Sequence, residues 1–279
     1  MNLPMLLFAL ALAGWKYWED KKAQLPEPKT EVQIQPAHTL VGSITFVAAV
    51  AGMSGAKLFH LFENPREFVA FFTHPSLEGF ISGLTIYGGI IIGSIVVLLY
   101  AKKKGLPLLQ LADAAAPGMI LAYGIGRMGC QVSGDGDWGI VNLHPKPFSW
   151  LPDWAWAYQY PHNVVNEGER IAGCFGNYCN QLPLPVYPTT FYEIVGTFVL
   201  FLIMWSFRKK VSQPGILTGV YLVFAGVERL LIEQIRVNNK YEFLPFKPTQ
   251  AELISVFLII FGIVFLIKSK SWFKTNKVN

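Results

Sequence analysis

Residues 251–267 read AELISVFLIIFGIVFLI, an apolar run that contains one charged residue, Glu252, and is followed directly by Lys268. A membrane-spanning helix needs about 20 consecutive apolar residues, and an apolar run that ends at a cation is typical of one. The composition of the whole chain agrees with this interpretation. Of its 279 residues, 52% are hydrophobic and 15% are charged, whereas a soluble domain has about 25% charged residues.

Similar apolar segments recur along the chain. We expect seven membrane-spanning helices, at residues 3–18, 40–61, 79–100, 111–130, 189–207, 215–235 and 251–267. The first segment is short and could instead be a signal peptide, but its charged residues follow the apolar run, which favours a span. The expected fold is an all-α polytopic membrane protein in which residues 1–279 form a single domain.

The basic residues predict the orientation of these helices. Clusters of Lys and Arg follow the first, third, fifth and seventh segments: Lys21 and Lys22; Lys102, Lys103 and Lys104; Arg208, Lys209 and Lys210; Lys268, Lys270, Lys274 and Lys277. Cytoplasmic loops carry an excess of these residues, so we expect the N-terminus outside and the C-terminus in the cytoplasm. The net charge of +5 follows from this pattern and from attraction to anionic membrane lipid, so it requires no nucleic acid as a partner.

The longest segment between predicted helices, residues 131–187, would lie on the extracytoplasmic side. It is rich in Gly, Pro and aromatic residues. A soluble domain is one interpretation, but so many amphipathic rings favour a cap insertion at the level of the lipid headgroups. Cys174 and Cys179 would face an oxidising compartment, where a disulfide between them is plausible. A metal site at these two sulfurs is less favoured, because no second pair of ligands has matching spacing.

Arg127 closes the fourth predicted helix and opens a glycine-rich segment, GRMGCQVSGDGDWG, at residues 126–139. An ionisable group at that depth costs about 2.5–3.5 kcal/mol to insert and usually faces a site inside the protein. Glycines let backbone N–H groups approach a ligand closely, and such concavities suit anions. Alternatively, Arg127 extends to the membrane interface, and Asp135 and Asp137 are simply solvated.

A second set of charges lies within the sixth predicted helix. Arg229, Glu233 and Arg236 have the spacing i, i+4, i+7, which places them on one helix face. An Arg229–Glu233 ion pair that reduces the insertion cost would be a purely structural explanation. That pair leaves Glu228, Arg236 and the buried Arg127 unexplained, so a binding site is favoured. Guanidinium groups bind phosphate, and the phosphate of a lipid is the anion most available at that depth.

Two shorter motifs contain further candidates. Tyr87 precedes the paired glycines Gly88 and Gly89 in the third predicted helix. Such glycines more often allow close helix packing than form a binding loop, and Tyr87 is either a packed ring or a polar group in a cavity. Tyr192 and Glu193 lie near the outer end of the fifth predicted helix. Glu193 could act there simply as a partner of the helix dipole.

These motifs, in this order and on alternating spans, resemble the prolipoprotein diacylglyceryl transferase family of bacteria over nearly the whole chain. The resemblance rests on a G-R-x-G-x-x-x-x-G motif, a Tyr-Glu pair and an R-x-x-x-E motif, which are carried here by Gly126, Arg127, Gly129, Gly134, Tyr192, Glu193, Arg229 and Glu233. Each motif alone is weakly specific, whereas the set in this order is strongly specific.

The resemblance implies a multi-pass enzyme of the bacterial cytoplasmic (inner) membrane. Its substrates would be phosphatidylglycerol and prolipoproteins: the diacylglyceryl group moves to the lipobox cysteine thiol, and glycerol phosphate is released. The expected catalytic residues are Arg127, Arg229, Glu233 and Tyr87. The expected substrate-binding residues are Arg127, Gly129, Gly134, Asp135, Asp137, Tyr192, Glu193 and Arg236. The resemblance implies no metal and no diffusible cofactor.

Negative charge grows on the phosphate in such a reaction as its bond to glycerol breaks. Arg127 and Arg229 would stabilise that charge in a low-dielectric pocket, where such contacts are strongest. Glu233 would hold Arg229 in orientation. Asp135 or Asp137 would accept hydrogen bonds from the glycerol hydroxyls.

The chain departs from the family pattern at Tyr87, where the family usually has a histidine that is often regarded as the base. It also has Cys130 in place of an asparagine and Ala225 in place of a tyrosine. A phenol is a poorer proton acceptor than an imidazole at neutral pH, so a related protein that binds the lipid headgroup without transferring it is an alternative. An anion transporter is less favoured, because such proteins tend to show internal repeats and none is visible here.

Overall fold

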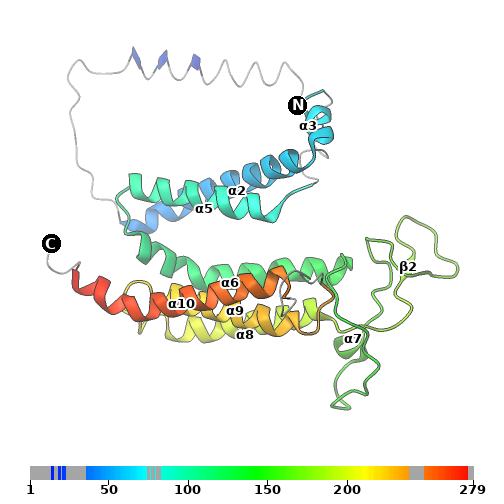
Figure 1. The fold of residues 1–279 in the computed structure, drawn as a ribbon. Coiled ribbons are helices and arrows are strands. Elements are labelled where there is room, and N and C mark those ends of the chain that lie inside the picture. Colours follow the sequence, from blue (N-terminus) through cyan, green and yellow to red (C-terminus); the bar gives the residue numbers. More distant parts are fainter. Residues whose placement is uncertain are drawn as a thin grey trace. The chain divides into compact units, whose positions relative to one another are not determined.

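The computed structural model describes residues 36–73, 83–238 and 248–275, together with Gly14, Trp15, Trp18, Glu19, Lys21, Lys22, Ser76 and Gly79. Seven long or medium helices account for most of this part: α2 (Val41–Glu63, after the 3-10 turn η1, Ala37–Leu40), α3 (Pro65–Thr73), α5 (Ile86–Lys103), α6 (Leu108–Ser133), α8 (Thr189–Phe207), α9 (Ile216–Glu233) and α10 (Gln250–Thr275). Between α6 and α8 lie the short helix α7 (Asp153–Trp156) and the two-residue strands β1 (Glu169–Arg170) and β2 (Asn180–Gln181) (Figure 1).

Five helices of the described part are long and apolar enough to cross a membrane: Ala37–Glu63, Ile86–Lys103, Leu108–Ser133, Thr189–Phe207 and Gln250–Ser269. They overlap five of the predicted spans. Helix α9 occupies the sixth, but carries Glu228, Arg229 and Glu233 among its 18 residues. The first predicted span, residues 3–18, lies almost wholly outside the described residues. The all-α membrane fold is therefore confirmed, whereas the number of seven spans and their orientation stay predictions.

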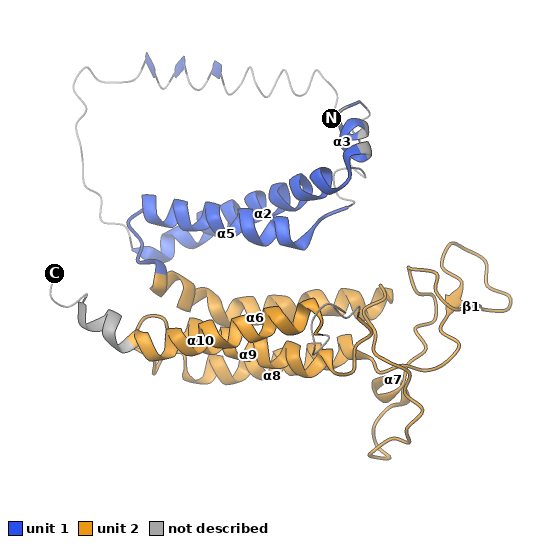
Figure 2. Ribbon diagram, in the orientation of Figure 1, with its two compact units in different colours: residues 1–108 blue, residues 109–279 orange. Residues whose placement is uncertain are grey.

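Residues 1–108 and residues 109–279 form two compact units (Figure 2). In the first unit, α2 and α5 approach each other closely through glycines. A Cβ atom on Gly55 would lie 2.5 Å from the carbonyl oxygen of Gly88, so Gly88 serves helix packing. Helix α5 begins at Ile86 and not at residue 79, because Gly83 has a φ of +60° and Thr85 is extended.

In the second unit, α6, α8, α9 and α10 lie side by side as a bundle (Figure 1). Residues from three of these helices form its buried apolar core: Ala116, Ile120, Met204 and Leu217. The buried Asp113 of α6 fixes the start of α9, since its carboxylate accepts the backbone N–H of Gly215 (2.6 Å) and of Thr218 (2.7 Å). These N–H groups have no partner within the helix, so the carboxylate satisfies donors that would otherwise be unpaired.

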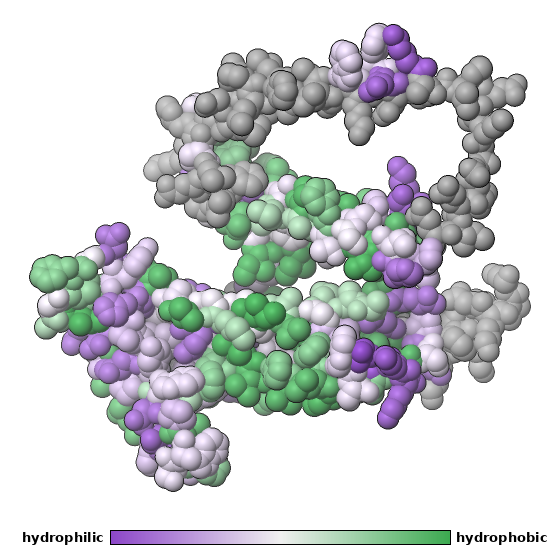
Figure 3. All heavy atoms as spheres, turned by 180° about the vertical axis from the view of Figure 1, so that it is seen from behind, coloured by the Kyte–Doolittle hydropathy of each residue, from purple (hydrophilic) through white to green (hydrophobic). Residues whose placement is uncertain are grey.

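The outer surface of the bundle is apolar. Figure 3 shows hydrophobic residues over these helices, whereas the segment between α6 and α8 is largely hydrophilic. On α8, for example, Val195, Phe198, Val199 and Leu202 are exposed. A contiguous exposed apolar surface of this kind is expected where lipid, and not water, surrounds the helices.

The segment between α6 and α8, residues 134–188, lies at one end of the bundle and is called the cap below (Figure 1). Gly134 ends α6 with a φ of +60°, and its N–H donates to the carbonyl of Cys130 (3.0 Å), as glycines at helix C-termini commonly do. The cap has a small core of its own, formed by Trp138, Tyr160, Leu182 and Val186. Cys174 and Cys179 form the expected disulfide.

Candidate active site

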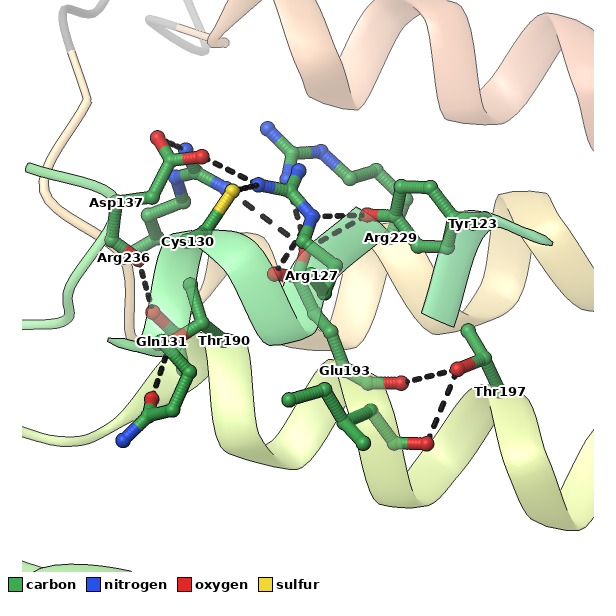
Figure 4. Close-up of polar contacts among 12 residues, drawn as sticks. Tyr123, Arg127, Cys130, Gln131, Asp137, Thr190, Glu193, Thr197, Arg229 and Arg236 are labelled. Carbon is green, nitrogen blue, oxygen red and sulfur yellow. Dashed lines mark hydrogen bonds and ion pairs between the residues drawn. The ribbon is translucent and has the colours of Figure 1, made fainter. Parts of the chain in front are cut away.

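Glu193 lies at the centre of a polar cluster where the bundle meets the cap (Figure 4). Its side chain, near the start of α8, is 0% exposed. Its Oε1 accepts hydrogen bonds from the Tyr123 hydroxyl (2.8 Å) and from Arg229 Nη1 (3.2 Å), and its Oε2 lies 3.1 Å from Arg127 Nε. A buried carboxylate is tolerated only when it is paired, and Glu193 has cationic partners on both α6 and α9.

Arg127 links α6 to α8 and to the cap. Its Nε also donates a hydrogen bond to the Tyr123 hydroxyl oxygen at 3.1 Å. Its Nη1 forms an ion pair with Asp137 and donates to Cys130 Sγ at 3.7 Å. Tyr123 precedes Arg127 by four residues, so both side chains lie on one face of α6. These contacts hold the guanidinium group in one orientation.

Arg229 forms the predicted ion pair with Glu233, with Nη2 3.3 Å from Oε2. The pair is not isolated, because Arg229 also reaches Glu193 and because Glu233 Oε1 accepts a hydrogen bond from Asn238 Nδ2 (2.7 Å). The adjacent Glu228 has a buried Oε1 that finds no hydrogen-bond partner among the described residues. Arg229 is therefore part of a network and not of a single ion pair.

Arg236 does not lie on the helix face that the i+7 spacing predicted, because α9 ends at Glu233. It lies instead in the segment after the helix, where it forms an isolated β-bridge with Gly139 of the cap. The N–H of Ile140 donates to the carbonyl of Ile235 at 2.8 Å in the same pairing. The cap thus places Arg236 by backbone hydrogen bonds.

Arg236 still reaches the same cluster. Its Nη2 forms an ion pair with Asp137, and its Nη1 lies 3.7 Å from Glu193 Oε1. Burial, and then the neighbouring charge of Arg127, lower the pKa of Arg236, because both disfavour a second buried cation. Asp137 and Glu193 supply the compensating negative charge.

Three guanidinium groups from three segments therefore surround one buried carboxylate. In the described part of the chain, their ion-pair partners are Asp137, Glu193 and Glu233. Fixed cations in surroundings of low dielectric constant stabilise an anion, or the negative charge that develops on a leaving group, far better than they would in water. Binding and stabilising a phosphate is the chemistry that this arrangement supports.

A second set of hydrogen bonds attaches the cap to the bundle beside the cluster. The Tyr160 hydroxyl donates to Gln131 Oε1 (2.9 Å) and lies 3.2 Å from the Thr190 hydroxyl. Burial raises the pKa of Tyr160 to about 12, so the hydroxyl stays protonated and can donate at neutral pH. Thr190 follows Thr189, whose hydroxyl donates to the carbonyl of Asp137 at 2.7 Å.

The other predicted binding residues lie around the cluster. The Tyr192 hydroxyl donates to the carbonyl of Trp156 in the cap (3.4 Å) and not to Glu193. Asp135 is exposed, and its Oδ1 accepts the N–H of Asp137 at 3.3 Å. Gly129 lies on the exposed side of α6, and Gly134 is buried at its end.

One group of side chains has the composition of a metal site. Ligand atoms of Cys130, Asp135 and Asp137 lie within 4.8 Å of one another. However, Asp137 already pairs with Arg127 and Arg236, and two guanidinium charges at a shared ligand repel a metal cation. We therefore assign no metal to this group.

Comparison with known proteins identifies the family. A sequence model described as prolipoprotein diacylglyceryl transferase matches residues 5–268. The chain belongs to the prolipoprotein diacylglyceryl transferase family. The resemblance inferred from the motifs is thereby confirmed.

Relatives within this family carry the name phosphatidylglycerol–prolipoprotein diacylglyceryl transferase. The protein of Corynebacterium diphtheriae is 30% identical over 203 residues, which are 72% of this chain and 68% of that protein. The protein of Leptospira interrogans is 29% identical over 223 residues, 71% of this chain and 63% of the relative. The protein of Clostridium tetani is 27% identical over 223 residues, 79% and 77% of the two chains. The matched part thus spans about two thirds of the length of several relatives.

Two residues of the polar cluster around Glu193 were not identified from the sequence: Tyr123 and Asn238. The spacing of Tyr123 and Arg127, i and i+4 on a predicted helix, could have indicated the first. Asn238 follows the helix, and no pattern indicated its contact with Glu233. Tyr87, which we expected to be catalytic, belongs to the first unit, where it lies on the first turn of α5 and is 52% exposed.

Proposed function

We propose that this chain transfers the diacylglyceryl group of phosphatidylglycerol to the cysteine thiol of a prolipoprotein. Phosphatidylglycerol and prolipoprotein are the two substrates in the names of its relatives. The thiol sulfur forms a bond to a glycerol carbon, and the bond between that carbon and the phosphate oxygen breaks. Glycerol phosphate leaves with the electron pair of the broken bond, and the thiol proton passes to a base. The reaction would take place at the bacterial cytoplasmic membrane.

The observation that carries this proposal is the convergence of Arg127 and Arg229, from α6 and α9, on the buried Glu193. Guanidinium groups that served helix insertion alone would be satisfied by one ion pair each. Here they are linked through a shared carboxylate and remain partly exposed, with side chains 15% and 23% accessible. Their positions support binding of a lipid phosphate at the level where the cap begins.

The charge that develops on the leaving phosphate would be stabilised by these arginines. Glu193 and Glu233 would act as positioning residues, because each holds a guanidinium group without needing to touch the lipid. A fixed pair of cations requires no reorganisation when the carbon–oxygen bond breaks, which is the main advantage of a preorganised site. Arg236 would add a third cation to the phosphate.

The glycerol hydroxyls and the thiol proton require further groups. Asp135 is an exposed carboxylate beside the cluster and would accept hydrogen bonds from the hydroxyls, with Gly129 leaving space on α6. Tyr192 would contact the substrate from the cap side. Tyr87, at the position of the family's histidine, would accept the thiol proton as its phenolate.

The experiment that tests this function uses purified protein in detergent micelles with phosphatidylglycerol and a peptide that contains a lipobox cysteine. Mass spectrometry should detect the peptide with a diacylglyceryl group in thioether linkage, together with free glycerol phosphate. A peptide with serine in place of the cysteine is the control. Absence of the thioether product at every pH, with phosphatidylglycerol still bound, would leave headgroup binding as the function.

A further inference from the structure

Asp137 connects two arginines that come from different segments. One of its carboxylate oxygens pairs with Arg127 Nη1 and the other with Arg236 Nη2 (Figure 4). Guanidinium groups bind the oxygens of carboxylates and of phosphates in the same geometry. The position between these two arginines is therefore suited to an anion with two neighbouring oxygens, and a side chain of the protein itself occupies it.

Asp137 differs in exposure from the other carboxylates of the cluster. Its side chain is 31% exposed, whereas those of Glu193 and Glu233 are 0% exposed. Breaking a buried ion pair leaves an uncompensated charge and is strongly unfavourable. A partly exposed pair contributes little, because water can replace either partner. Of the three paired carboxylates, Asp137 is the one that an incoming anion can replace.

The backbone of Asp137 stays in place during such an exchange. Its carbonyl accepts the Thr189 hydroxyl at 2.7 Å, and its N–H donates to Asp135 Oδ1 at 3.3 Å. The carboxylate is one bond away from Cβ, so a change of side-chain rotamer is enough to move it from the arginines into water. The exchange requires no rearrangement of the cap.

Arg236 has an unused donor at this position. Its side chain is only 8% exposed, and its Nη1 has no hydrogen-bond partner among the residues that the structure describes, with Glu193 Oε1 at 3.7 Å. A buried N–H group without a partner is unfavourable. A phosphate has more oxygens than a carboxylate and can satisfy this donor in addition to the two that Asp137 occupies.

The charge balance of the cluster favours a phosphate that replaces the Asp137 carboxylate over one that binds in addition to it. In the described part of the cluster, three carboxylates already neutralise three guanidinium groups, and Glu228 adds a carboxyl group beside them. A phosphate that joined this cluster would bring excess negative charge into surroundings of low dielectric constant, which is unfavourable. A phosphate that replaces the Asp137 carboxylate leaves the balance nearly unchanged.

We propose that the Asp137 carboxylate occupies the place of a phosphate group between Arg127 and Arg236, and that the phosphate of the bound lipid displaces it. The inference rests on the proposed function for the nature of the lipid. It changes the role of Asp137 from an acceptor for glycerol hydroxyls to a competitor of the substrate phosphate.

The test measures the affinity of the full chain for phosphatidylglycerol in mixed micelles. Asparagine cannot compete as an anion, so Asp137→Asn should bind the lipid about fivefold more tightly than the wild type, in the range expected for a partly exposed ion pair. Asp153→Asn is the matched control, because it removes an exposed cap aspartate that pairs with Lys146 at 2.7 Å. The control should bind like the wild type.

Inorganic phosphate and glycerol 1-phosphate serve as competing probes. A gain in affinity for the lipid and for both probes supports a general phosphate site, and a gain for the lipid alone assigns the site to the headgroup. The double variant Asp137→Asn/Arg236→Gln should lose the gain, because the second substitution removes one of the two arginines. Asp137→Ser, which also lacks the charge, should show the same gain and guards against a folding defect peculiar to asparagine.

Weaker or unchanged lipid binding by both Asp137 variants, with an unfolding temperature like that of the wild type, would overturn the inference. The result does not depend on turnover. Tighter lipid binding by the Asp137 variants without any thioether product from the wild type would contradict the proposed transferase function and support this phosphate site. Thioether formation by the wild type, with unchanged lipid affinity in the Asp137 variants, would support the transferase function and contradict the phosphate site.

Discussion

Arg127 Nε lies 3.1 Å from Glu193 Oε2, although the two residues belong to different helices, α6 and α8. The carboxylate is fully buried and also contacts Arg229 of α9. One anion therefore fixes two cations from separate helices before any substrate arrives. Glu193 is therefore the centre of the cluster, and not simply a partner of the α8 dipole.

Replacement of Glu193 by glutamine should destabilise the second unit and abolish turnover. The substitution preserves the shape but leaves three guanidinium groups with only two paired carboxylates, Asp137 and Glu233. Because the lost carboxylate is fully buried, we expect a loss of about 3–5 kcal/mol in the free energy of unfolding. Denaturant unfolding in detergent measures it. Glu167→Gln, at an exposed position of the cap, should change stability by less than about 0.5 kcal/mol. Equal stability of the two variants would show that this charge does not hold the cluster together.

Substitutions of Arg127 and Arg229 test whether turnover needs only the positive charge of these side chains or also the planar shape of the guanidinium group. Arg127→Ala and Arg229→Ala should each abolish turnover, because each removes a cation from the proposed phosphate site. Arg229→Lys keeps the charge but loses the planar fork that contacts Glu193 and Glu233 together. Loss of one charged hydrogen bond corresponds to about 1.5–3 kcal/mol, or about 10- to 100-fold in kcat/KM. Full activity of Arg229→Lys would make Arg229 a structural ion-pair member.

The helices could be predicted from the sequence because lipid imposes a simple rule of length and hydropathy. Helix α8 begins at Thr189 and ends at Phe207, as predicted. Helix α5 begins later than predicted. The apolar run in the sequence extends through Gly83, but the positive φ of Gly83 is not compatible with a right-handed helix. Local backbone geometry, and not composition, sets that boundary.

The cluster could be predicted only in part. Arg229 and Glu233 share a helix, so their spacing indicated the contact. The contacts of Arg127 with Glu193 and of Arg236 with Asp137 depend on how separate segments pack, and periodicity specifies faces but not partners. The β-bridge between Gly139 and Arg236 illustrates this point, because it places Arg236 in the cluster although the helix has already ended.

Removal of the Tyr160 hydroxyl should loosen the cap. The hydroxyl donates to Gln131 Oε1, and burial raises its pKa to about 12. Tyr160→Phe leaves the buried Thr190 and the partly buried Gln131 with one partner fewer, so we expect a loss of about 1–2 kcal/mol in the free energy of unfolding. The loss should be constant between pH 6 and pH 9, roughly, because the hydroxyl stays protonated throughout that range. Denaturant unfolding at several pH values measures this, and a loss that disappears toward pH 9 would contradict it.

Tyr87 allows the last prediction, which concerns the thiol proton. If the phenol takes part in proton transfer, Tyr87→Phe should lower kcat strongly at unchanged KM for phosphatidylglycerol, since the arginine cluster that we propose to bind the phosphate is intact. Tyr87→His should raise kcat at neutral pH, because an imidazole accepts a proton there more readily than a phenol. General acid–base groups typically contribute about 10²- to 10⁴-fold. Initial rates of thioether formation across a pH series measure both variants. Rates of Tyr87→Phe equal to those of the wild type would exclude the hydroxyl from proton transfer, and the base would then have to be sought among other residues.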